Sequence, residues 1–241
     1  STNEARSPTR SPVVVIGIDG AEWEMIEPLL KAGKLPHLAR LMNRGSYGTL
    51  ETIEPILSPL IWTTMATGHA PERHGITWFM ERDPNTGKTT PIGSRTRKVR
   101  ALWNIASEAN KQVAAVGWWA TWPAENVRGW IVSDHVAAHG FGLRAQNIET
   151  DLGKTHPPEL LDELRPLIVR PAQITDAEVR EFMDVSDQEL ATRRGDDLEF
   201  SNPLHHFLFA LSTLKTYANF GRLALSKAHP DLALFYFEAV D

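Results

Sequence analysis

The stretch VVVIGID, residues 13–19, decides the fold class of this chain. It is a short, apolar and largely β-branched run that meets Gly20 at once. This pattern is typical of a strand that is buried on both faces and ends in a tight turn. Because strands of this kind belong to parallel sheets, we expect a buried parallel strand here, with Asp19 at its carboxyl end.

The sequence beyond this strand alternates between helical and extended spacing. Helices are expected at residues 23–42 in two parts, at 58–68, from about 101, and at 203–227. Further strands are expected at residues 47–53, from about 112, at 128–134 and at 231–241. The alternation predicts an α/β fold with a central, mostly parallel sheet layered between helices.

Two segments stand apart from this alternation. Residues 1–12 are polar, contain proline and show no periodicity, which is typical of a disordered leader or of a tether left after removal of a signal segment. Residues 151–200 are charged, helical in spacing and punctuated by proline, with no predicted strand, and are expected to form a helical insertion over one end of the sheet. Residues 13–241 are otherwise expected to form one α/β domain.

The composition excludes several classes of protein. The formal charge of -5, from 25 basic and 30 acidic residues, gives no basic face for a nucleic-acid scaffold. The absence of cysteine excludes thiolate metal ligands, disulfides and cysteine nucleophiles. The longest apolar stretches fall well short of the roughly 20 residues that span a bilayer, so no transmembrane segment is predicted.

Candidate chemical groups lie at strand ends and at one helix start. Asp19 and Asp241 each end a predicted strand, and ligands of open α/β sheets bind outside the carboxyl ends of the strands. Ser58 with Pro59 matches a helix start, where serine is a preferred N-cap and proline a favoured first residue. The same position places a hydroxyl beside unpaired amides, which is a ready anion site. Ser58 is therefore either a helix cap or a nucleophile.

A nucleophilic serine needs a neighbouring base or a metal. No G-x-S-x-G elbow surrounds Ser58, and the chain has no P-loop and no paired-glycine dinucleotide motif. The simplest remaining explanation is that a metal bound to oxygen ligands such as Asp19 activates the Ser58 hydroxyl.

Three stretches together carry a family resemblance: VVVIGIDG, LSPLIWTTMATGHAPERHGI and LFYFEAVD. They resemble the type I phosphodiesterase and nucleotide pyrophosphatase branch of the alkaline phosphatase superfamily. That family has a strand ending in Asp-Gly, a Thr or Ser nucleophile, a Thr-Gly pair nine and ten residues later, and a Pro-x-x-His-Gly-Ile tail. The residues that keep this register are Ser58, Thr67, Gly68, Pro71, His74, Gly75 and Ile76.

The resemblance implies a metal-dependent hydrolase of small phosphoric esters. It implies two divalent metal ions, usually zinc, with Asp19 and Ser58 binding one and Asp241 the other. The Ser58 oxygen would attack phosphorus in line and form a covalent phosphoryl-enzyme. A diester or pyrophosphate is expected over a monoester. The same scaffold also hosts phosphomonoesterases, sulfatases and phosphonate hydrolases, which stay as alternatives.

The sequence departs from the family pattern at two places. Where the nucleotide pyrophosphatases have an asparagine that helps to hold the phosphoryl oxygen, three residues after His-Gly-Ile, this chain has Phe79. The resemblance therefore implies that Phe79 contacts the substrate, and the change puts nucleotide specificity in doubt. The family also continues from the strand-end aspartate as Asp-x-x-x-His and supplies further Asp and His ligands, and none of these follows Asp241. We therefore expect a truncated chain whose remaining ligands lie beyond it, or a non-catalytic anion-binding domain.

The remaining candidates have an ordinary structural interpretation beside the functional one. Trp119 and Trp122 could form the wall of a leaving-group pocket, as the resemblance implies, or belong to the core. His135 and His139 have the spacing of metal ligands on a helix, yet they follow a strand, and a surface loop is favoured. His74 is expected to brace its loop. Export, with a periplasmic or lipid-tethered location, is favoured over the cytoplasm because many members of the family are exported.

Overall fold

A computed structural model of the chain describes residues 11–82, 86–137, 151–192 and 201–238. The strands are β1 (Val13–Ile18), β2 (Met80–Arg82), β3 (Thr89–Pro91), β4 (Val113–Val116), β5 (Gly129–Val132), β6 (Thr155–His156) and β7 (Leu232–Phe237). The α-helices are α1 (Trp23–Lys31), α2 (Pro36–Met42), α3 (Ser58–Thr67), α4 (Pro71–His74), α5 (Leu102–Glu108), α6 (Leu160–Leu164), α7 (Asp176–Arg180), α8 (Asp187–Thr192) and α9 (Pro203–Lys227). Two short 3₁₀ helices are η2 (Arg165–Leu167) and η3 (Pro171–Gln173).

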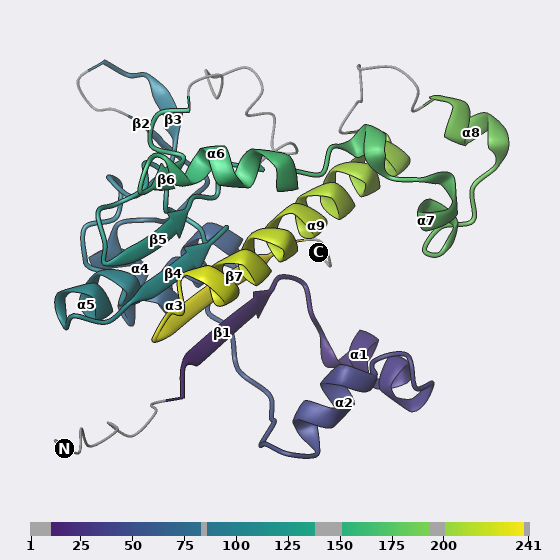
Figure 1. Ribbon diagram of the computed structural model, residues 1–241, viewed down its shortest axis with the longest axis horizontal. Coiled ribbons are helices and arrows are strands. Elements are labelled where there is room, and N and C mark those ends of the chain that lie inside the picture. Colours follow the sequence, from purple (N-terminus) through teal and green to yellow (C-terminus); the bar gives the residue numbers. More distant parts are fainter. Residues whose placement is uncertain (1–10, 83–85, 138–150, 193–200, 239–241) are drawn as a thin grey trace, which may run out of the picture.

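The main sheet has the strand order β1-β7-β4-β5-β6 (Figure 1). The pairs β1 with β7, β7 with β4 and β4 with β5 are parallel, and only β6 runs antiparallel, against β5. A separate antiparallel pair joins β2 and β3. The predicted α/β class with a mostly parallel sheet is confirmed.

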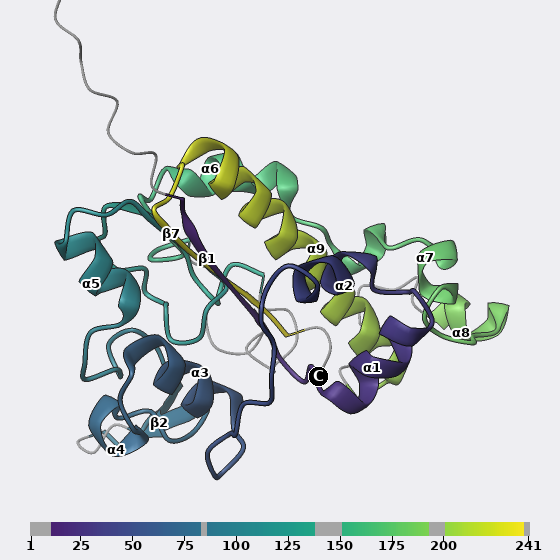
Figure 2. The same cartoon turned by 90° about the horizontal axis from the view of Figure 1, so that it is seen from below.

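Helices cover both faces of this sheet. On one face, α9 packs Tyr217, Phe220 and Ala224 against side chains of β4 and β7 such as Val116 and Phe235. On the other face, α3 and α5 pack against the alternate residues of the same strands, and this second core cluster consists of Trp62, Ala66, Ala101, Trp103, Val113, Ala115, Trp118, Val127, Ile131, Leu232, Leu234 and Tyr236. Figure 2 shows α9 and α3 on opposite sides of β1 and β7. The alternation of a strand's side chains between two faces produces this three-layer arrangement.

The longest helix begins where its sequence predicts. The Asn202 side chain caps α9 by accepting hydrogen bonds from the amides of Leu204 (2.9 Å) and His205 (3.3 Å), and Pro203 occupies the first turn, where its missing N–H is tolerated. The buried residues of α9 recur at helical spacing. Those of its C-terminal half face the sheet, whereas Leu204 and Leu208 pack in a separate cluster with residues of the segment 174–190. In the described residues, no helix combines the length and the apolarity that a membrane crossing requires.

Three expectations about strands are corrected by the structure. Residues 47–53 form no strand, because Tyr47 packs on Trp23 and Leu50 is 81% exposed, with no neighbouring strand to pair with. The hairpin of β2 and β3 and the short strand β6 were not expected, since elements of two or three residues carry no readable periodicity. Because β6 pairs with β5, residues 151–200 contribute to the sheet as well as supplying helices.

The burial expected for β1 is also corrected. In the described chain, β1 is the edge strand, and Val13 (58%) and Ile16 (56%) are largely exposed. The strands that are buried on both faces are β4 and β7. The helices α1 and α2 extend away from the sheet beside this edge and bury no side chain (Figure 1). Residues 1–10 of the expected leader lie outside the described residues.

Candidate active site

Asp19 is held at the end of β1 by two side chains from different elements. The Trp62 Nε1–H of α3 donates to one carboxylate oxygen at 3.1 Å, and the Tyr236 hydroxyl of β7 donates to the other at 2.6 Å. The Asp19 amide also continues the strand ladder by donating to the Phe237 carbonyl at 2.9 Å. Three elements of the fold therefore converge on one carboxylate.

This convergence follows from the register of β1 and β7. Gly17 lies opposite Tyr236, and the Trp62 ring lies directly over Gly17, where an added Cβ would stand 2.5 Å from the ring. Asp19 is two residues further on and therefore has its side chain on the same face of the sheet as Gly17. The absence of a side chain at Gly17 lets the indole approach the strand and reach Asp19.

Ser58 is the first residue of α3 and is not its cap. Leu57 occupies the N-cap position with extended dihedral angles, and the helix start has no side-chain capping bond. The expected capping arrangement is thus shifted by one residue, within the usual spread of helix boundaries. Among the described residues, the half-buried Ser58 hydroxyl makes no hydrogen bond. The hydroxyl is available for a ligand.

The helix brings Ser58 and Asp19 to the same end of the fold. Ser58 and Trp62 are four residues apart and lie on one face of α3, and helical side chains lean toward the helix N-terminus. The indole that contacts Asp19 therefore points back toward the turn that carries Ser58. The first-turn amides and the helix dipole give this end of α3 a partial positive charge, which favours a bound anion and an ionised hydroxyl.

The oxygen donors at this end of the fold fit one side of a metal centre. Each Asp19 oxygen accepts one hydrogen bond and keeps a further lone pair, and carboxylate and hydroxyl oxygens suit divalent cations. In the part of the chain that the structure describes, no cluster of three or more His, Cys, Asp or Glu residues could hold an ion. Asp241, the other expected ligand, lies outside the described residues. Two donors are fewer than the three protein ligands typical of catalytic zinc.

His74 braces the loop after α3, as expected. Its ring is fully buried, and Nδ1 accepts a hydrogen bond from the Ile76 amide at 3.1 Å. The other ring nitrogen, Nε2, lies 3.0 Å from the Thr64 hydroxyl, which itself donates to the Leu60 carbonyl. Because Nδ1 accepts and the Thr64 proton is already used, the neutral tautomer with hydrogen on Nε2 satisfies every group. His74 therefore links α3 to α4.

The protonation of His74 makes stability depend on pH. Burial lowers the pKa of His74 below 6.5, and this effect outweighs the opposing influence of Glu72. As pH falls below about 6.5, the unfolded chain binds a proton that the native chain does not, so the free energy of unfolding decreases. The stability that depends on a neutral His74 is fully present above about pH 6.5. Below that pH the free energy of unfolding decreases by less than about 1.4 kcal/mol per pH unit. Urea unfolding between about pH 5 and pH 7 measures it.

The matched comparison is between His74→Gln and His37→Gln. The buried-site variant should be less stable at neutral pH and should show a flatter pH dependence than the parent protein. His37 is exposed, so its variant should keep the parent's pH dependence. Equal slopes for the parent and His74→Gln would show that other groups produce the effect.

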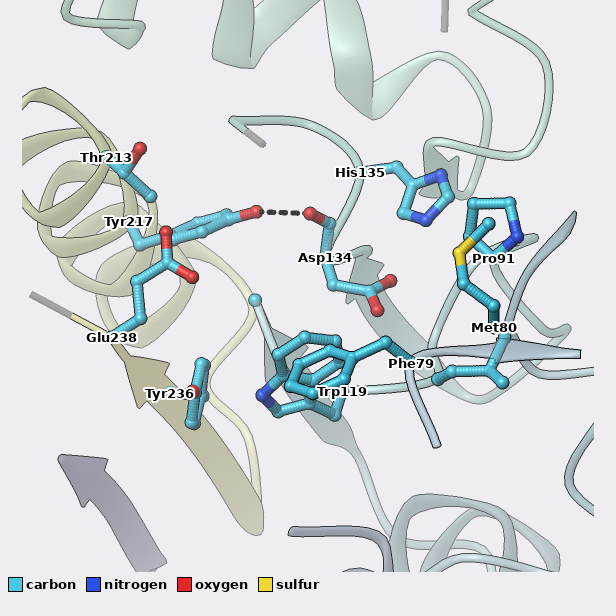
Figure 3. A pocket seen from close by; sticks show the side chains of 12 residues that line it. Phe79, Met80, Pro91, Trp119, Asp134, His135, Thr213, Tyr217, Tyr236 and Glu238 are labelled. Atoms are coloured by element: carbon cyan, nitrogen blue, oxygen red, sulfur yellow. Dashed lines mark hydrogen bonds between the residues drawn. The ribbon is translucent and has the colours of Figure 1, made fainter. Parts of the chain in front are cut away.

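A pocket of about 230 Å³ opens at the carboxyl ends of β4, β5 and β7, and one of its lining residues is Tyr236, whose hydroxyl contacts Asp19. Phe79 and Trp119, both expected to contact substrate, line it (Figure 3). Their rings are 5.7 Å apart at 72°. Trp122 does not line this pocket and instead stacks on His135, with ring centroids 4.7 Å apart. The structure thus brings together two of the three aromatic residues expected to bind substrate.

The expectation for His135 was wrong in one respect. His135 lies in a turn after β5, as a loop residue should, but it is only 8% exposed and lines the pocket. The surface-loop interpretation failed because the Trp122 ring covers the imidazole. His139 lies outside the described residues.

The sequence offered Asp134 only as a third possible acid at a strand end, with no motif to support it, and did not identify Tyr236 as a site residue. The Asp134 carboxylate accepts hydrogen bonds from the Ala120 amide (3.0 Å), the Thr121 hydroxyl (3.1 Å) and the Trp122 amide (3.1 Å), which fixes the loop that carries Trp119. Burial raises the pKa of this carboxyl. A strand-end position was the only signal for Asp134, and Tyr236 was hidden inside an apolar strand.

The layered parallel sheet, with an acid at the end of β1 and a serine at the start of the adjoining helix, defines an α/β protein of the alkaline phosphatase-like fold. The chain belongs to the type I phosphodiesterase / nucleotide pyrophosphatase family, whose model matches residues 13–241. This confirms the resemblance seen in the sequence and places the chain in a family of phosphoric ester hydrolases. Among curated proteins, none matches this sequence.

Solved structures resemble this chain at low sequence identity. Phosphonoacetate hydrolase from Sinorhizobium meliloti 1021, in complex with phosphonoacetate, is 16% identical with a TM-score of 0.53, and the match covers 96% of this chain and 47% of that one. Human ectonucleotide pyrophosphatase / phosphodiesterase 5 is 14% identical with a TM-score of 0.48, over 95% of this chain and 43% of that one. The chain thus spans less than half the length of either structure.

Proposed function

We propose that this protein is a metal-dependent hydrolase of phosphoric esters that uses Ser58 as its nucleophile. The observation that carries the proposal is the Ser58 hydroxyl. It lies at the positive end of α3, makes no capping bond, and shares a helix face with the Trp62 side chain that contacts Asp19. A serine that served only to cap the helix would have its hydroxyl engaged with the amides of the first turn.

In the proposed reaction, the Ser58 oxygen attacks phosphorus in line and the bond to the leaving oxygen breaks. The serine proton passes through solvent to the departing oxygen, which leaves as an alcohol. The Ser58 oxygen stays bonded to the phosphoryl group, which for a diester still carries its second substituent, until water hydrolyses it. The first-turn amides of α3 orient the phosphoryl oxygens. Asp19, Ser58 and Asp241 are the residues that would hold two divalent metal ions, zinc being the metal we propose. When bound, such ions would lower the pKa of the serine hydroxyl and neutralise charge at the phosphoryl group.

The pocket lined by Tyr236 favours a diester over a monoester. A diester has a second organic substituent and one negative charge on phosphorus, whereas a monoester has a second ionisable oxygen in that place. The described residues that line the pocket include aromatic rings and carboxylates but no lysine or arginine. The aromatic part of this lining accepts an organic substituent.

The proposed function is tested by hydrolysis of four substrates by the full-length protein. They are an aryl phosphodiester, the aryl monoester, the aryl sulfate and phosphonoacetate. We expect kcat/KM for the diester to exceed the others by about tenfold or more, and we expect chelation to abolish turnover until metal is restored.

Each other outcome points to a named alternative. Preference for the monoester, the sulfate or phosphonoacetate would reassign the protein to a phosphomonoesterase, a sulfatase or a phosphonate hydrolase on the same scaffold. Metal binding without turnover of any substrate would identify a non-catalytic anion-binding domain.

A further inference from the structure

The loop after β4, residues 117–122, contains a backbone conformation that its sequence does not favour. Ala120 has a φ of 58°, in the left-handed region, where residues other than glycine, asparagine, aspartate and histidine are uncommon. Among the described residues, the other non-glycine residues with a positive φ are Asn110 and His229, whose types tolerate it better. Strained residues persist only where their surroundings stabilise them, and they concentrate at functional sites.

The side chain of Asp134, just after the neighbouring strand β5, stabilises this conformation. One carboxylate oxygen accepts a hydrogen bond from the Ala120 amide at 3.0 Å, and the other accepts from the Trp122 amide at 3.1 Å. The Thr121 hydroxyl lies 3.1 Å from the second oxygen and accepts a hydrogen bond from the Asp134 amide at 3.0 Å. Three consecutive residues of the loop are therefore bound to Asp134.

The other neighbours of Asp134 leave this acceptor role in place. Tyr217 of α9 donates to the Asp134 carbonyl at 3.1 Å, and His135 follows in the same turn (Figure 3). Burial raises the pKa of Asp134, whereas His135 and the hydrogen bonds from Thr121 and Ala120 act in the opposite direction. Because the loop presents hydrogen-bond donors to both carboxyl oxygens, the site requires two acceptors. A carboxylate supplies both, and a carboxamide supplies one.

Ala120 connects this carboxylate to the wall of the pocket. Its amide belongs to the peptide bond that joins it to Trp119, so the hydrogen bond to Asp134 fixes the orientation of the Trp119 main chain. The Ala120 methyl group is fully buried with Ile76 and Ile92, and Trp119 packs against this cluster. The main chain and the side chain of Trp119 are therefore both constrained.

We propose that Asp134 is a positioning residue of the candidate active site. It stabilises the left-handed conformation of Ala120 and thereby fixes the position of the Trp119 ring. That ring lies 5.7 Å from Phe79 and 6.3 Å from Tyr236, measured between ring centroids. The structural part of this inference depends only on these contacts, and its kinetic consequence rests on the proposed function. Because Asp134 acts through a residue that lines the pocket, its loss should affect substrate binding more than the chemical step.

Kinetics of the full-length Asp134→Asn variant test the proposal. A carboxamide has one acceptor oxygen, so in either orientation its NH₂ group meets an N–H donor of the loop. We expect KM for an aryl phosphodiester to rise about tenfold while kcat changes by less than about twofold. Partial unfolding would instead lower kcat and leave KM unchanged.

Asp231→Asn is the matched control. The Asp231 carboxylate accepts a hydrogen bond from the Gln112 amide at 2.9 Å, and it does not line the pocket. This variant should keep the KM and the kcat of the parent protein. An unchanged KM in folded Asp134→Asn, or an equal rise of KM in Asp231→Asn, would overturn the proposal.

Ala120→Gly in the Asp134→Asn background tests whether the effect passes through the backbone. Glycine adopts a positive φ at little steric cost, so it should keep the loop conformation without the carboxylate and return KM to within about threefold of the parent value. If Asp134 acted by touching the substrate, the glycine would restore nothing. Asn110→Gly in the same background changes a left-handed residue (φ 57°) outside the pocket and should restore nothing. Failure of Ala120→Gly to lower KM, or equal recovery with Asn110→Gly, would contradict the proposal.

Thr121→Val decides the question if Asp134→Asn does not fold. Valine has about the volume of threonine and removes one of the three contacts between the loop and Asp134. We expect KM to rise about threefold in this variant. An unchanged KM in Thr121→Val would then count against the positioning role.

A measurement that needs no turnover separates this proposal from the proposed function. In full-length protein labelled with 5-fluorotryptophan, the fluorine NMR resonance of Trp119 is assigned with Trp119→Phe. It should shift or broaden in Asp134→Asn and return toward the parent position when Ala120→Gly is added. An unchanged resonance in Asp134→Asn would overturn the positioning role whether or not the ester is hydrolysed. A shifted resonance without hydrolysis of any ester would leave the positioning role in place and overturn the proposed function.

Discussion

Replacement of Ser58 by alanine should lower kcat for an aryl phosphodiester by about 10³-fold or more while leaving the fold intact. The substitution removes only the hydroxyl group, and in the described residues no hydrogen bond depends on this group. The free energy of unfolding should therefore change by less than about 0.5 kcal/mol. Steady-state kinetics and urea unfolding of the full-length variant measure the two quantities.

The outcome distinguishes the two roles that the sequence left open for Ser58. If Ser58 only capped the helix, Ser58→Ala would lower the free energy of unfolding by about 1 kcal/mol and would leave kcat unchanged. Ser46→Ala, at an exposed position before α3, is the matched control and should leave both quantities unchanged. Isolation of a covalent phosphoryl adduct on Ser58, which for a diester substrate retains the second ester substituent, from the parent protein after rapid acid quenching would identify the nucleophile directly.

Replacement of Tyr236 by phenylalanine should weaken the metal affinity of the full-length protein, or its kcat, by about 10–100-fold. The Tyr236 hydroxyl donates to Asp19 at 2.6 Å, and its loss leaves that oxygen without its partner. Burial, with the nearby Asp19 charge, raises the pKa of Tyr236, so the phenol remains a donor throughout the working pH range. Competition with a chromophoric chelator measures the affinity, and steady-state assays measure kcat.

The Tyr236→Phe variant keeps the ring, so the pocket wall should remain. Tyr47→Phe, where the ring is exposed and contacts Trp23, is the matched control and should change neither quantity. Unchanged affinity and unchanged kcat in Tyr236→Phe would show that Trp62 alone positions Asp19, or that Asp19 binds no metal.

The parts of the fold that the sequence predicted are those with long periodic patterns. The strands β4, β5 and β7 and the helices α5 and α9 were expected close to their observed bounds, because runs of apolar residues report burial directly. The same reasoning failed for residues 47–53, where an apolar and β-branched run has no strand to pair with. Strand formation depends on a neighbour that lies far away in the sequence, and local patterns do not reveal it.

Candidate site residues could be proposed from the sequence where they stand at the end of a strand or the start of a helix. They were missed where their role depends on how two distant strands pair. Asp19 and Ser58 could be proposed as site residues because strand ends and helix starts are visible in the sequence. Tyr236 was missed because its role requires knowing that β1 pairs with β7 in the register that places Gly17 opposite it. The Trp62 ring packs in the core, and its Nε1–H also contacts Asp19, which an apolar position on a helix does not reveal.

The edge strand β1 affects how this polypeptide must be handled in solution. Along one side of β1 the described residues provide no partner strand, and its exposed side chains include Val13 and Ile16. A free apolar edge of this kind is a template on which another chain can add a strand. A segment or partner that covered the β1 edge would therefore also protect the protein against self-association. Exposure of this edge would appear first as concentration-dependent aggregation rather than as loss of activity.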